Sequence, residues 1–424
     1  NPDQRFVPAS NTKMFTTATA FWSLPGLDQP DSAGGTRIRL EGGRVPDVVL
    51  EGRGDARLSS AADCTVDCLA TLAGAVAAKA KRVHDVIGDD SWFPDERWGP
   101  GMSWNNIETK YGTGISALTL DDNEYPGTIA PGAVGGPPRL TAPGFYTIEN
   151  GATTVASGGR GLRYNRAPNG DTLRVNGTID AVAKPTEWRL GIDDPARWAA
   201  FSLRKLLEAR GVTVTGTIGV RHRPLTSADD PAVRKGTPAA HPPEAAALAS
   251  LTPPPLAEDL RIINKVSQNL HAELMLRRIS RVSGSGSIAD GQARVQAMLA
   301  TAGVPRTAFD FADGSGMSNY NRINPRGTVT MLRWIAAQPW GAAWRETLPV
   351  GGVDGSLKRL AGTPLDHKLF AKTGTLNASS ALSGYIIAKS GRTLTFSLLA
   401  NDMPEDRSVA KQMDAALQLI AAAN

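Results

Sequence analysis

The chain has 424 residues and a formal net charge of +5, with 41% hydrophobic and 21% charged residues. These values are ordinary for a globular protein, and the length exceeds one simple core, so we expect two or three domains. Lys and Arg are scattered rather than striped, which argues against a nucleic-acid partner, and the sequence has no run of 18 apolar residues that would predict a transmembrane helix.

Helices and short strands alternate along the first half of the chain. The spacing of apolar residues predicts a helix over 10–22 and another over 65–81. Residues 99–170 are rich in Gly and Pro and contain short alternating segments, so we expect loops and strands there. A third helix is predicted over 194–211, with Asp194 as its N-cap.

The second half begins with a Pro- and Ala-rich stretch, 224–255, which is typical of a linker. Residues 256–279 then predict one or two helices, and 368–389 and 392–402 predict neighbouring antiparallel strands. A closing amphipathic helix follows residue 406, and we expect it to pack against the sheet rather than a membrane. A helix near the start and a sheet with a helix at the end indicate one domain built from both ends of the chain, with the middle inserted.

The only two cysteines, Cys64 and Cys68, stand four positions apart. A metal site would need more Cys or His nearby, so we predict no metal. A small disulfide of an oxidising compartment is slightly favoured over two free, buried thiols. Because i and i+4 on a regular helix suit a disulfide poorly, a bridge would require a loop or a helix start at this point.

Several common catalytic motifs are absent from the sequence. It has no G-x-S-x-G elbow, no H-E-x-x-H and no Walker loop. None of the five histidines lies in a recognisable triad. If a serine is the nucleophile, its base is therefore expected to be something other than histidine.

Ser10 and Lys13 are the first candidate pair. Three positions along a helix place a lysine amine on the same face as a serine hydroxyl, and burial can lower the pKa of a lysine enough for it to act as a base. A serine at a helix start also has free backbone N–H groups nearby for an oxyanion hole. The spacing alone is weak, because Ser202 and Lys205 share it inside the 194–211 helix, and a simple N-cap is the alternative for Ser10.

Two further motifs follow downstream. Ser267-Gln268-Asn269 offers a serine to relay a proton and an amide to hold a lysine and the substrate, although Ser267 could equally cap a helix and residues 103–105 also fit the S-x-N pattern. Lys372, Thr373 and Gly374 stand at the head of a predicted strand. There the lysine and threonine can bind a substrate carboxylate, and the glycine lets the backbone approach a ligand.

The order S-x-x-K, S-x-N, K-T-G is the signature set of serine β-lactamases and penicillin-binding proteins. The 257 positions between Ser10 and Ser267 are far more than β-lactamases have there. The chain resembles the class C low-molecular-mass penicillin-binding proteins over essentially its whole length. The longer matching strings are RFVPASNTK, LEGRGDARLS, SQNLHAELML, DGSGMSNYNRINP, LPVGGVDGSL and KTGTLNASSALSGYI.

The resemblance implies a fold and a division of the chain. The fold is α+β: a penicillin-binding, β-lactamase-like transpeptidase domain, with an antiparallel sheet flanked by helices and two mainly β inserted domains. We expect a discontinuous catalytic domain, an inserted domain II that is also discontinuous, and an inserted domain III. Their respective ranges are 1–29 with 254–424, 30–52 with 131–253, and 53–130.

The resemblance also implies a D-alanyl-D-alanine carboxypeptidase or endopeptidase that acts on peptidoglycan peptides and is inhibited by β-lactams. Ser10 would attack the carbonyl of the penultimate D-alanine, with Lys13 as base, and Ser267 would pass the proton to the departing amine, steadied by Asn269. The terminal carboxylate would be bound by Lys372 and Thr373. The oxyanion hole would be formed by the backbone N–H groups of Ser10 and Thr375.

No cofactor is implied by this chemistry. The substrate places the protein in the periplasm or the extracytoplasmic envelope. The sequence shows no signal peptide, and we expect the natural chain to extend upstream of Asn1.

Three residues bear on specificity. Relatives carry an acidic residue in a Trp-x-Asp context, followed five places later by an aromatic residue, and the acid binds the free amine of diaminopimelate. Here Trp104 marks the matching stretch, Asn106 stands in place of the acid, and Tyr111 is the aromatic residue five places later. Arg322 matches an arginine that meets the distal carboxylate. Loss of the acid with retention of the arginine indicates a third stem residue that has a carboxylate but no free amine.

Two alternative functions remain at this stage. One is a β-lactamase or esterase on the same fold, which would need a well-placed base for deacylation. The other is a catalytically inactive peptidoglycan-binding protein, against which the presence of every motif residue argues.

Overall fold

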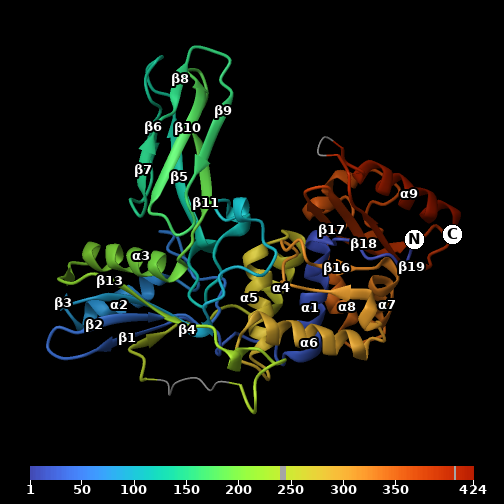
Figure 1. Cartoon of the computed structure of the whole chain (residues 1–424), viewed down its shortest axis with the longest axis horizontal. Coiled ribbons are helices and arrows are strands. Elements are labelled where there is room, and N and C mark those ends of the chain that lie inside the picture. The colour runs from blue at the N-terminus through green and yellow to red at the C-terminus, as the bar shows by residue number, and fades with distance from the viewer. Residues whose placement is uncertain (239–244, 405–406) are drawn as a thin grey trace.

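The computed structural model describes residues 1–238, 245–404 and 407–424 (Figure 1). Part of the predicted 224–255 linker lies outside these described residues. Within the described ranges no helix has the length and apolar character needed to cross a bilayer.

Segments from the two ends of the chain pack together (Figure 1). The first helix, α1, lies against α4, α5, α6 and α8 and brings apolar residues such as Met14, Phe15 and Ala18 into their core. The bounds of the helices in this unit are α1 (Thr12–Ser23), α4 (Leu256–Lys265), α5 (Asn269–Ser280), α6 (Ile288–Thr301), α7 (Pro325–Ala336), α8 (Gly341–Glu346) and α9 (Ala410–Ala423).

An antiparallel sheet completes this unit in the order β17-β18-β19. Successive side chains of β18 point to opposite faces, so Tyr385 joins the core around α7 while Ile386 joins the core that contains Leu417 of α9. The sheet is thus enclosed by helices on both faces, as expected, and the closing helix packs against it. The strands are β17 (Leu369–Leu376), β18 (Ser379–Ile387) and β19 (Thr393–Ala400).

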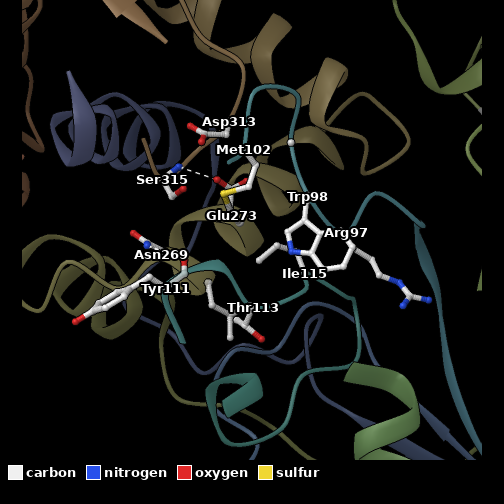
Figure 2. Close-up of a pocket in the computed structure, with 12 residues that line it drawn as sticks. Arg97, Trp98, Met102, Tyr111, Thr113, Ile115, Asn269, Glu273, Asp313 and Ser315 are labelled. Carbon is white, nitrogen blue, oxygen red and sulfur yellow. Dashed lines mark hydrogen bonds between the residues drawn. The ribbon is translucent and has the colours of Figure 1, made fainter. Parts of the chain in front are cut away.

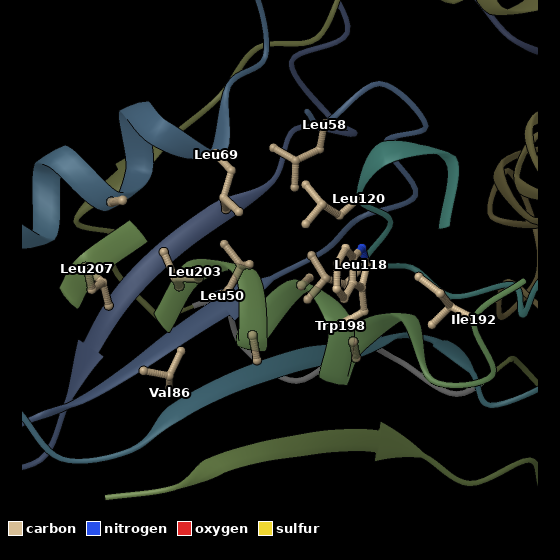
Figure 3. Close-up of a cluster of buried hydrophobic side chains, with 14 of the residues drawn as sticks. Leu50, Leu58, Leu69, Val86, Leu118, Leu120, Ile192, Trp198, Leu203 and Leu207 are labelled. Carbon is tan, nitrogen blue, oxygen red and sulfur yellow. The ribbon is translucent and has the colours of Figure 1, made fainter. Parts of the chain in front are cut away.

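The middle of the chain forms a five-stranded sheet in the order β13-β4-β2-β1-β14. Helices α2 (Leu69–Lys79) and α3 (Pro195–Ala209) cover it, and their Leu side chains meet those of the strands in one core (Figure 3). The strands are β1 (Arg37–Glu41), β2 (Asp47–Glu51), β4 (Val86–Pro94), β13 (Ile218–Arg223) and β14 (Ala249–Ser250).

Two small sheets form an arm that rises from this part of the molecule (Figure 1). One has the order β11-β5-β6, and the other has the order β7-β10-β8 with β9 paired to β10. Their bounds are β5 (Glu124–Ala130), β6 (Arg139–Thr141), β7 (Thr147–Asn150), β8 (Thr153–Val155), β9 (Gly161–Asn165), β10 (Thr172–Asp180) and β11 (Thr186–Gly191). Short two-residue pairs elsewhere are β3 (Arg82–Val83) with β12 (Thr213–Val214), and β15 (Phe309–Asp310) with β16 (Arg322–Ile323).

The mixed α/β fold with inserted sheets confirms the predicted fold class, but strand pairs cross the predicted boundaries between the two inserted domains at residue 52 and at residue 130, where β5 pairs with β6 and β11. Strand β4 lies in the predicted 53–130 domain, yet it pairs in parallel with β2 and β13, which belong to the other predicted insertion. Backbone hydrogen bonds between β2 and β4 therefore cross the boundary at residue 52. The rest of the domain division stays a prediction.

The disulfide between Cys64 and Cys68 is formed, with Cα atoms 5.8 Å apart. Asp67 has a positive φ of 61° and Cys68 is extended, so the bridge closes a loop before α2 rather than a helical turn. For this reason α2 begins at Leu69, four residues later than predicted. The helix predicted over 194–211 is confirmed as α3, and the Asp194 side chain accepts a hydrogen bond from Arg197 N at 3.0 Å.

Candidate active site

Ser10 lies in a short 3-10 turn, Ala9–Asn11, directly before α1. The predicted helix start at residue 10 is thus wrong by two residues, because the turn is tighter than an α-helix. Lys13 follows in the first turn of α1, and its Nζ lies 3.0 Å from Ser10 Oγ. The short spacing and the helical backbone together bring the two side chains into contact, as predicted.

Lys13 is completely buried, and three oxygen atoms surround its amine. Besides Ser10 Oγ, its Nζ donates to Asn269 Oδ1 and to the Ser315 carbonyl, each at 2.6 Å. A neutral amine has two N–H donors and one lone pair. It can therefore donate to Asn269 and Ser315 while its lone pair faces the hydroxyl of Ser10.

Burial lowers the pKa of Lys13 to about 7, and the nearby carboxylates of Asp313 and Glu273 oppose that shift. Taking an ammonium out of water favours its neutral form. At neutral pH a large share of Lys13 is therefore free of the extra proton and can act as a base.

Ser267 stands in the break between α4 and α5, so residues 256–279 form two helices. It has a positive φ of 66°, and its Oγ lies 2.9 Å from Lys372 Nζ. The amide of Asn269 uses its oxygen for Lys13 and donates from Nδ2 to the Tyr111 carbonyl at 2.9 Å. The predicted contact of Asn269 with a lysine is therefore present as a hydrogen bond from Lys13. Its predicted contact with a substrate amide stays a prediction.

Strand β17 brings the K-T-G motif against the nucleophile turn. Lys372 is buried, and its carbonyl accepts a hydrogen bond from Asn11 Nδ2 at 2.8 Å. A Cβ on Gly374 would lie 2.5 Å from the Pro8 carbonyl and 3.0 Å from Ser10 N. Only glycine permits this approach of the two backbones.

Burial, followed by the positive charge of Lys13, lowers the pKa of Lys372. Its Nζ also donates to the Thr373 carbonyl at 3.1 Å. Thr373 Oγ1 lies 2.6 Å from the hydroxyl of Ser356, a residue that motif reasoning missed. Thr375 is exposed one pleat further along the strand.

The turn over 313–316 is the largest part of the site that the motifs did not predict. Ser315 gives Lys13 its third contact, and Gly316, with a φ of 93°, passes so close that a Cβ there would lie 1.9 Å from the Ala9 carbonyl. Figure 2 shows Ser315, Asp313 and Glu273 gathered near Asn269. The D-G-S-G letters at 313–316 were the available signal, because two glycines beside a polar pair indicate a tight backbone approach.

The three predicted specificity residues lie in two segments, one of 3-10 turns and the other at the start of β16. Asn106 is half-buried and Tyr111 is exposed, in successive 3-10 turns. Arg322 is half-buried and donates to the carbonyls of Asn319 and Asn321, at 2.7 and 2.8 Å. The Tyr111 carbonyl reaches the motif through Asn269, whereas no side-chain contact among the described residues joins Asn106 or Arg322 to Ser10 or Lys13.

The second serine and lysine with the same spacing are separate from this site. Ser202 and Lys205 lie inside α3, where Lys205 Nζ is 5.0 Å from the centre of the Phe201 ring. Among the described residues, Asp47, His84 and Asp85 place possible metal ligands within 4.8 Å of one another. His84 Nδ1 already contacts Asp47 Oδ1 at 3.1 Å, and the group belongs to the five-stranded sheet rather than to the site around Ser10.

Comparisons with known proteins agree with this geometry. A model of the D-Ala-D-Ala carboxypeptidase 3 (S13) family matches residues 1–423. A D-alanyl-D-alanine carboxypeptidase of Actinomadura sp. is 32% identical over 426 residues, which cover 94% of this chain and 74% of that protein. DacB of Haemophilus influenzae, also a D-alanyl-D-alanine carboxypeptidase, is 24% identical over 409 residues, with coverage of 92% and 79%.

A solved structure shares the fold. The crystal structure of penicillin binding protein 4 (dacB) from Haemophilus influenzae superposes with a TM-score of 0.79 at 20% identity, covering 99% of this chain and 92% of that one. The same protein in complex with a β-lactam superposes with a TM-score of 0.74 at 19% identity, with the same coverage.

Proposed function

Because the chain belongs to the D-Ala-D-Ala carboxypeptidase 3 (S13) family, we propose that Ser10 is the nucleophile with which it cleaves peptidoglycan stem peptides after D-alanine. The family makes the chain a serine D-Ala-D-Ala carboxypeptidase/endopeptidase. The observation that supports the role of Ser10 is the contact of its hydroxyl with the wholly buried amine of Lys13.

Acylation begins when neutral Lys13 takes the hydroxyl proton of Ser10. Ser10 Oγ then bonds to the carbonyl carbon of the penultimate D-alanine, and the negative charge moves to the carbonyl oxygen. Backbone N–H groups of Ser10 and Thr375 stabilise that oxygen, the arrangement that lowers barriers in acyl transfer. The resulting lysine ammonium keeps its hydrogen bonds to Asn269 and to the Ser315 carbonyl.

The leaving amine receives its proton through Ser267. Ser267 gives its hydroxyl proton to the amine as the C–N bond breaks, and it regains a proton from the ammonium of Lys13. Lys372, 2.9 Å from Ser267 Oγ, holds that hydroxyl in place and offers its amine to the substrate carboxylate. Thr373 and its neighbour Ser356 offer hydroxyls to the same carboxylate. Water then attacks the ester on Ser10 and releases the shortened peptide.

A β-lactam acylates Ser10 by the same route, because its strained amide takes the place of the D-alanyl-D-alanine bond. The ring-opened product keeps its amine attached, so the adduct on Ser10 persists longer than the peptide acyl-enzyme. The substrate places the protein in the extracytoplasmic envelope. The Cys64–Cys68 disulfide fits an oxidising compartment of that kind.

Digestion of purified peptidoglycan tests this function. We expect mass spectrometry to show loss of terminal D-alanine from pentapeptides, which is carboxypeptidase action, or loss of crosslinked dimers, which is endopeptidase action. Both cut a bond after D-alanine, so either outcome supports the proposal. Products cut elsewhere in the peptide would contradict it, and so would the absence of products from penicillin-free enzyme whose Ser10 reacts with penicillin in a parallel assay.

The third stem residue is expected to lack a free amine. Asn106 carries no charge that could pair with an ammonium, while Arg322 makes no ion pair with a described residue and can meet a carboxylate. Amidation or a crosslink at that amine would remove the charge and suit the neutral side chain of Asn106.

The Asn106→Asp variant tests whether the uncharged side chain of Asn106 sets the preference for a third stem residue without a free amine. The new carboxylate should raise kcat/KM for a pentapeptide with a free diaminopimelate amine about fivefold, because an exposed ion pair contributes about 1 kcal/mol. Asn106→Ser, which adds no charge, is the matched control. A wild-type enzyme that strongly prefers the free amine would show that Asn106 does not define this preference.

A further inference from the structure

Helix α5 carries three polar side chains at successive turns of one face. Asn269, Glu273 and Arg277 are each four residues apart, the spacing that stacks side chains along a helix. Asn269 touches Lys13 directly. Glu273 and Arg277 are buried and form an ion pair, with Arg277 Nη1 3.1 Å from Glu273 Oε2.

The other carboxylate oxygen of Glu273 holds the turn over 313–316. Glu273 Oε1 accepts hydrogen bonds from Gly314 N at 2.9 Å and from Ser315 N at 2.8 Å, and Figure 2 draws the bond from Ser315 as a dashed line. The carbonyl of the same Ser315 accepts the hydrogen bond from Lys13. The position of that carbonyl therefore depends on the two bonds that its own turn makes to Glu273.

The opposite end of the turn is held independently. Asp313 accepts from Gly316 N at 2.8 Å, from Ser318 N at 2.6 Å and from Asn321 Nδ2 at 2.7 Å. Thr16 of α1 donates to the Gly314 carbonyl at 2.7 Å. Among the described residues, only Glu273 accepts hydrogen bonds from the N–H groups of Gly314 and Ser315.

We propose that Glu273 is a positioning residue for acylation, which holds the Ser315 carbonyl against the Lys13 amine and places a negative charge beside that amine. The proposal rests on the proposed role of Lys13 as the base. Two backbone N–H groups and one guanidinium donate hydrogen bonds to this carboxylate, and bonds to a charged acceptor are the strong ones.

The titratable groups that face Lys13 are Glu273, Asp313 and Lys372. The two carboxylates raise the pKa of Lys13 against the effect of burial. Burial, and then Glu273, raise the pKa of Asp313 to about 6, so Asp313 is mostly ionised at pH 7 with or without Glu273. Loss of the Glu273 charge therefore lowers the pKa of Lys13.

Two substitutions separate the charge from the hydrogen bonds. Glu273→Gln keeps an oxygen that can accept from Gly314 N and Ser315 N but removes the charge, and Glu273→Ala removes both. Asp31→Asn is the matched control, because Asp31 pairs with Arg278 of the same helix at 2.6 and 2.7 Å and accepts a hydrogen bond from Gly34 N. The measurement is the second-order rate constant for acylation by a fluorescent penicillin as a function of pH, with thermal melting of each variant.

The acylation rate should rise with pH as Lys13 loses its proton, and we call this rise the acidic limb of the profile. We expect Glu273→Gln to move the acidic limb about one pH unit lower, because a nearby opposite charge shifts the pKa of a group such as Lys13 by an amount of this order. Glu273→Ala should also lower the plateau about 10- to 100-fold, the cost of a displaced catalytic group. Asp31→Asn should lower the melting temperature and leave the limb in place.

The proposal would be overturned if both Glu273 variants kept the acidic limb and the plateau of the wild-type acylation profile and differed from the wild type only in a lower melting temperature. An equal shift in Asp31→Asn, or a Glu273→Gln chain that does not fold, would also overturn it. If Glu273→Ala does not fold, the acylation profile of Glu273→Gln alone tests the proposal. Failure of this inference leaves Lys13 as the base, whereas a wild-type profile without a limb near pH 7 would count against Lys13 itself.

Discussion

Replacing Ser10 by alanine is expected to abolish release of D-alanine from a D-alanyl-D-alanine peptide, by a factor on the order of 10⁴–10⁶. The acyl-enzyme cannot form without the Ser10 oxygen. Ser267 cannot replace it as the nucleophile, because Lys372 holds Ser267 Oγ at 2.9 Å. The measurement is the initial rate of D-alanine release at saturating peptide. Labelling by fluorescent penicillin should disappear in the same variant.

Ser202→Ala is the matched control for this prediction. Ser202 has the same S-x-x-K spacing but lies inside α3, away from the three motifs. Its variant should release D-alanine at the wild-type rate. A Ser10→Ala chain that keeps more than a small fraction of activity, with wild-type melting, would place the nucleophile elsewhere.

Replacing Lys13 by methionine is expected to slow acylation by penicillin about 10²–10⁴-fold, the usual contribution of a general base. Methionine fills a similar volume, so the fold should survive the loss of a wholly buried amine. In the wild type, the rate of acylation should rise as pH increases through about 7, because protonated Lys13 has no lone pair to accept the Ser10 proton. In Lys13→Met this limb should vanish.

Lys205→Met provides the corresponding control. Lys205 packs over the ring of Phe201 on α3, so its loss should leave both the rate and the pH profile of acylation unchanged. Acylation of Lys13→Met at the wild-type rate, with an unchanged acidic limb, would assign the proton transfer to a different group.

The local parts of the site could be predicted from the sequence. Ser10 and Lys13 are three residues apart at a helix start, so backbone geometry alone brings their side chains together. The order of the three motifs then indicated that Asn269 and Lys372 return to the same place, and the contacts of Asn269 with Lys13 and of Lys372 with Ser267 confirm it.

The parts that could not be predicted depend on backbone atoms and on distant pairings. The Ser315 carbonyl meets Lys13 across 302 positions, and a carbonyl leaves no trace in residue type. The contact of Ser356 with Thr373 joins a hydroxyl of the 3-10 helix Gly355–Leu360 to one of strand β17. The pairing of β2 with β4 was missed for a related reason, since a short apolar strand does not specify which strand it will join.

The same reasoning explains why Glu273 was overlooked. In the sequence it is one acidic residue on a predicted helix, where an exposed position is the usual expectation. Its burial becomes meaningful only once Arg277 and the turn over 313–316 are seen around it. Interaction with backbone N–H groups from a different segment requires the tertiary structure.

The most direct test of the account is to find which residue carries the penicillin adduct. The wild-type protein is incubated with penicillin at neutral pH, digested, and mapped by tandem mass spectrometry. The account predicts one adduct, on Ser10, and no adduct in Ser10→Ala. An adduct on Ser267, Ser202 or any other residue, or an unmodified Ser10 in a folded and peptide-cleaving enzyme, would contradict it.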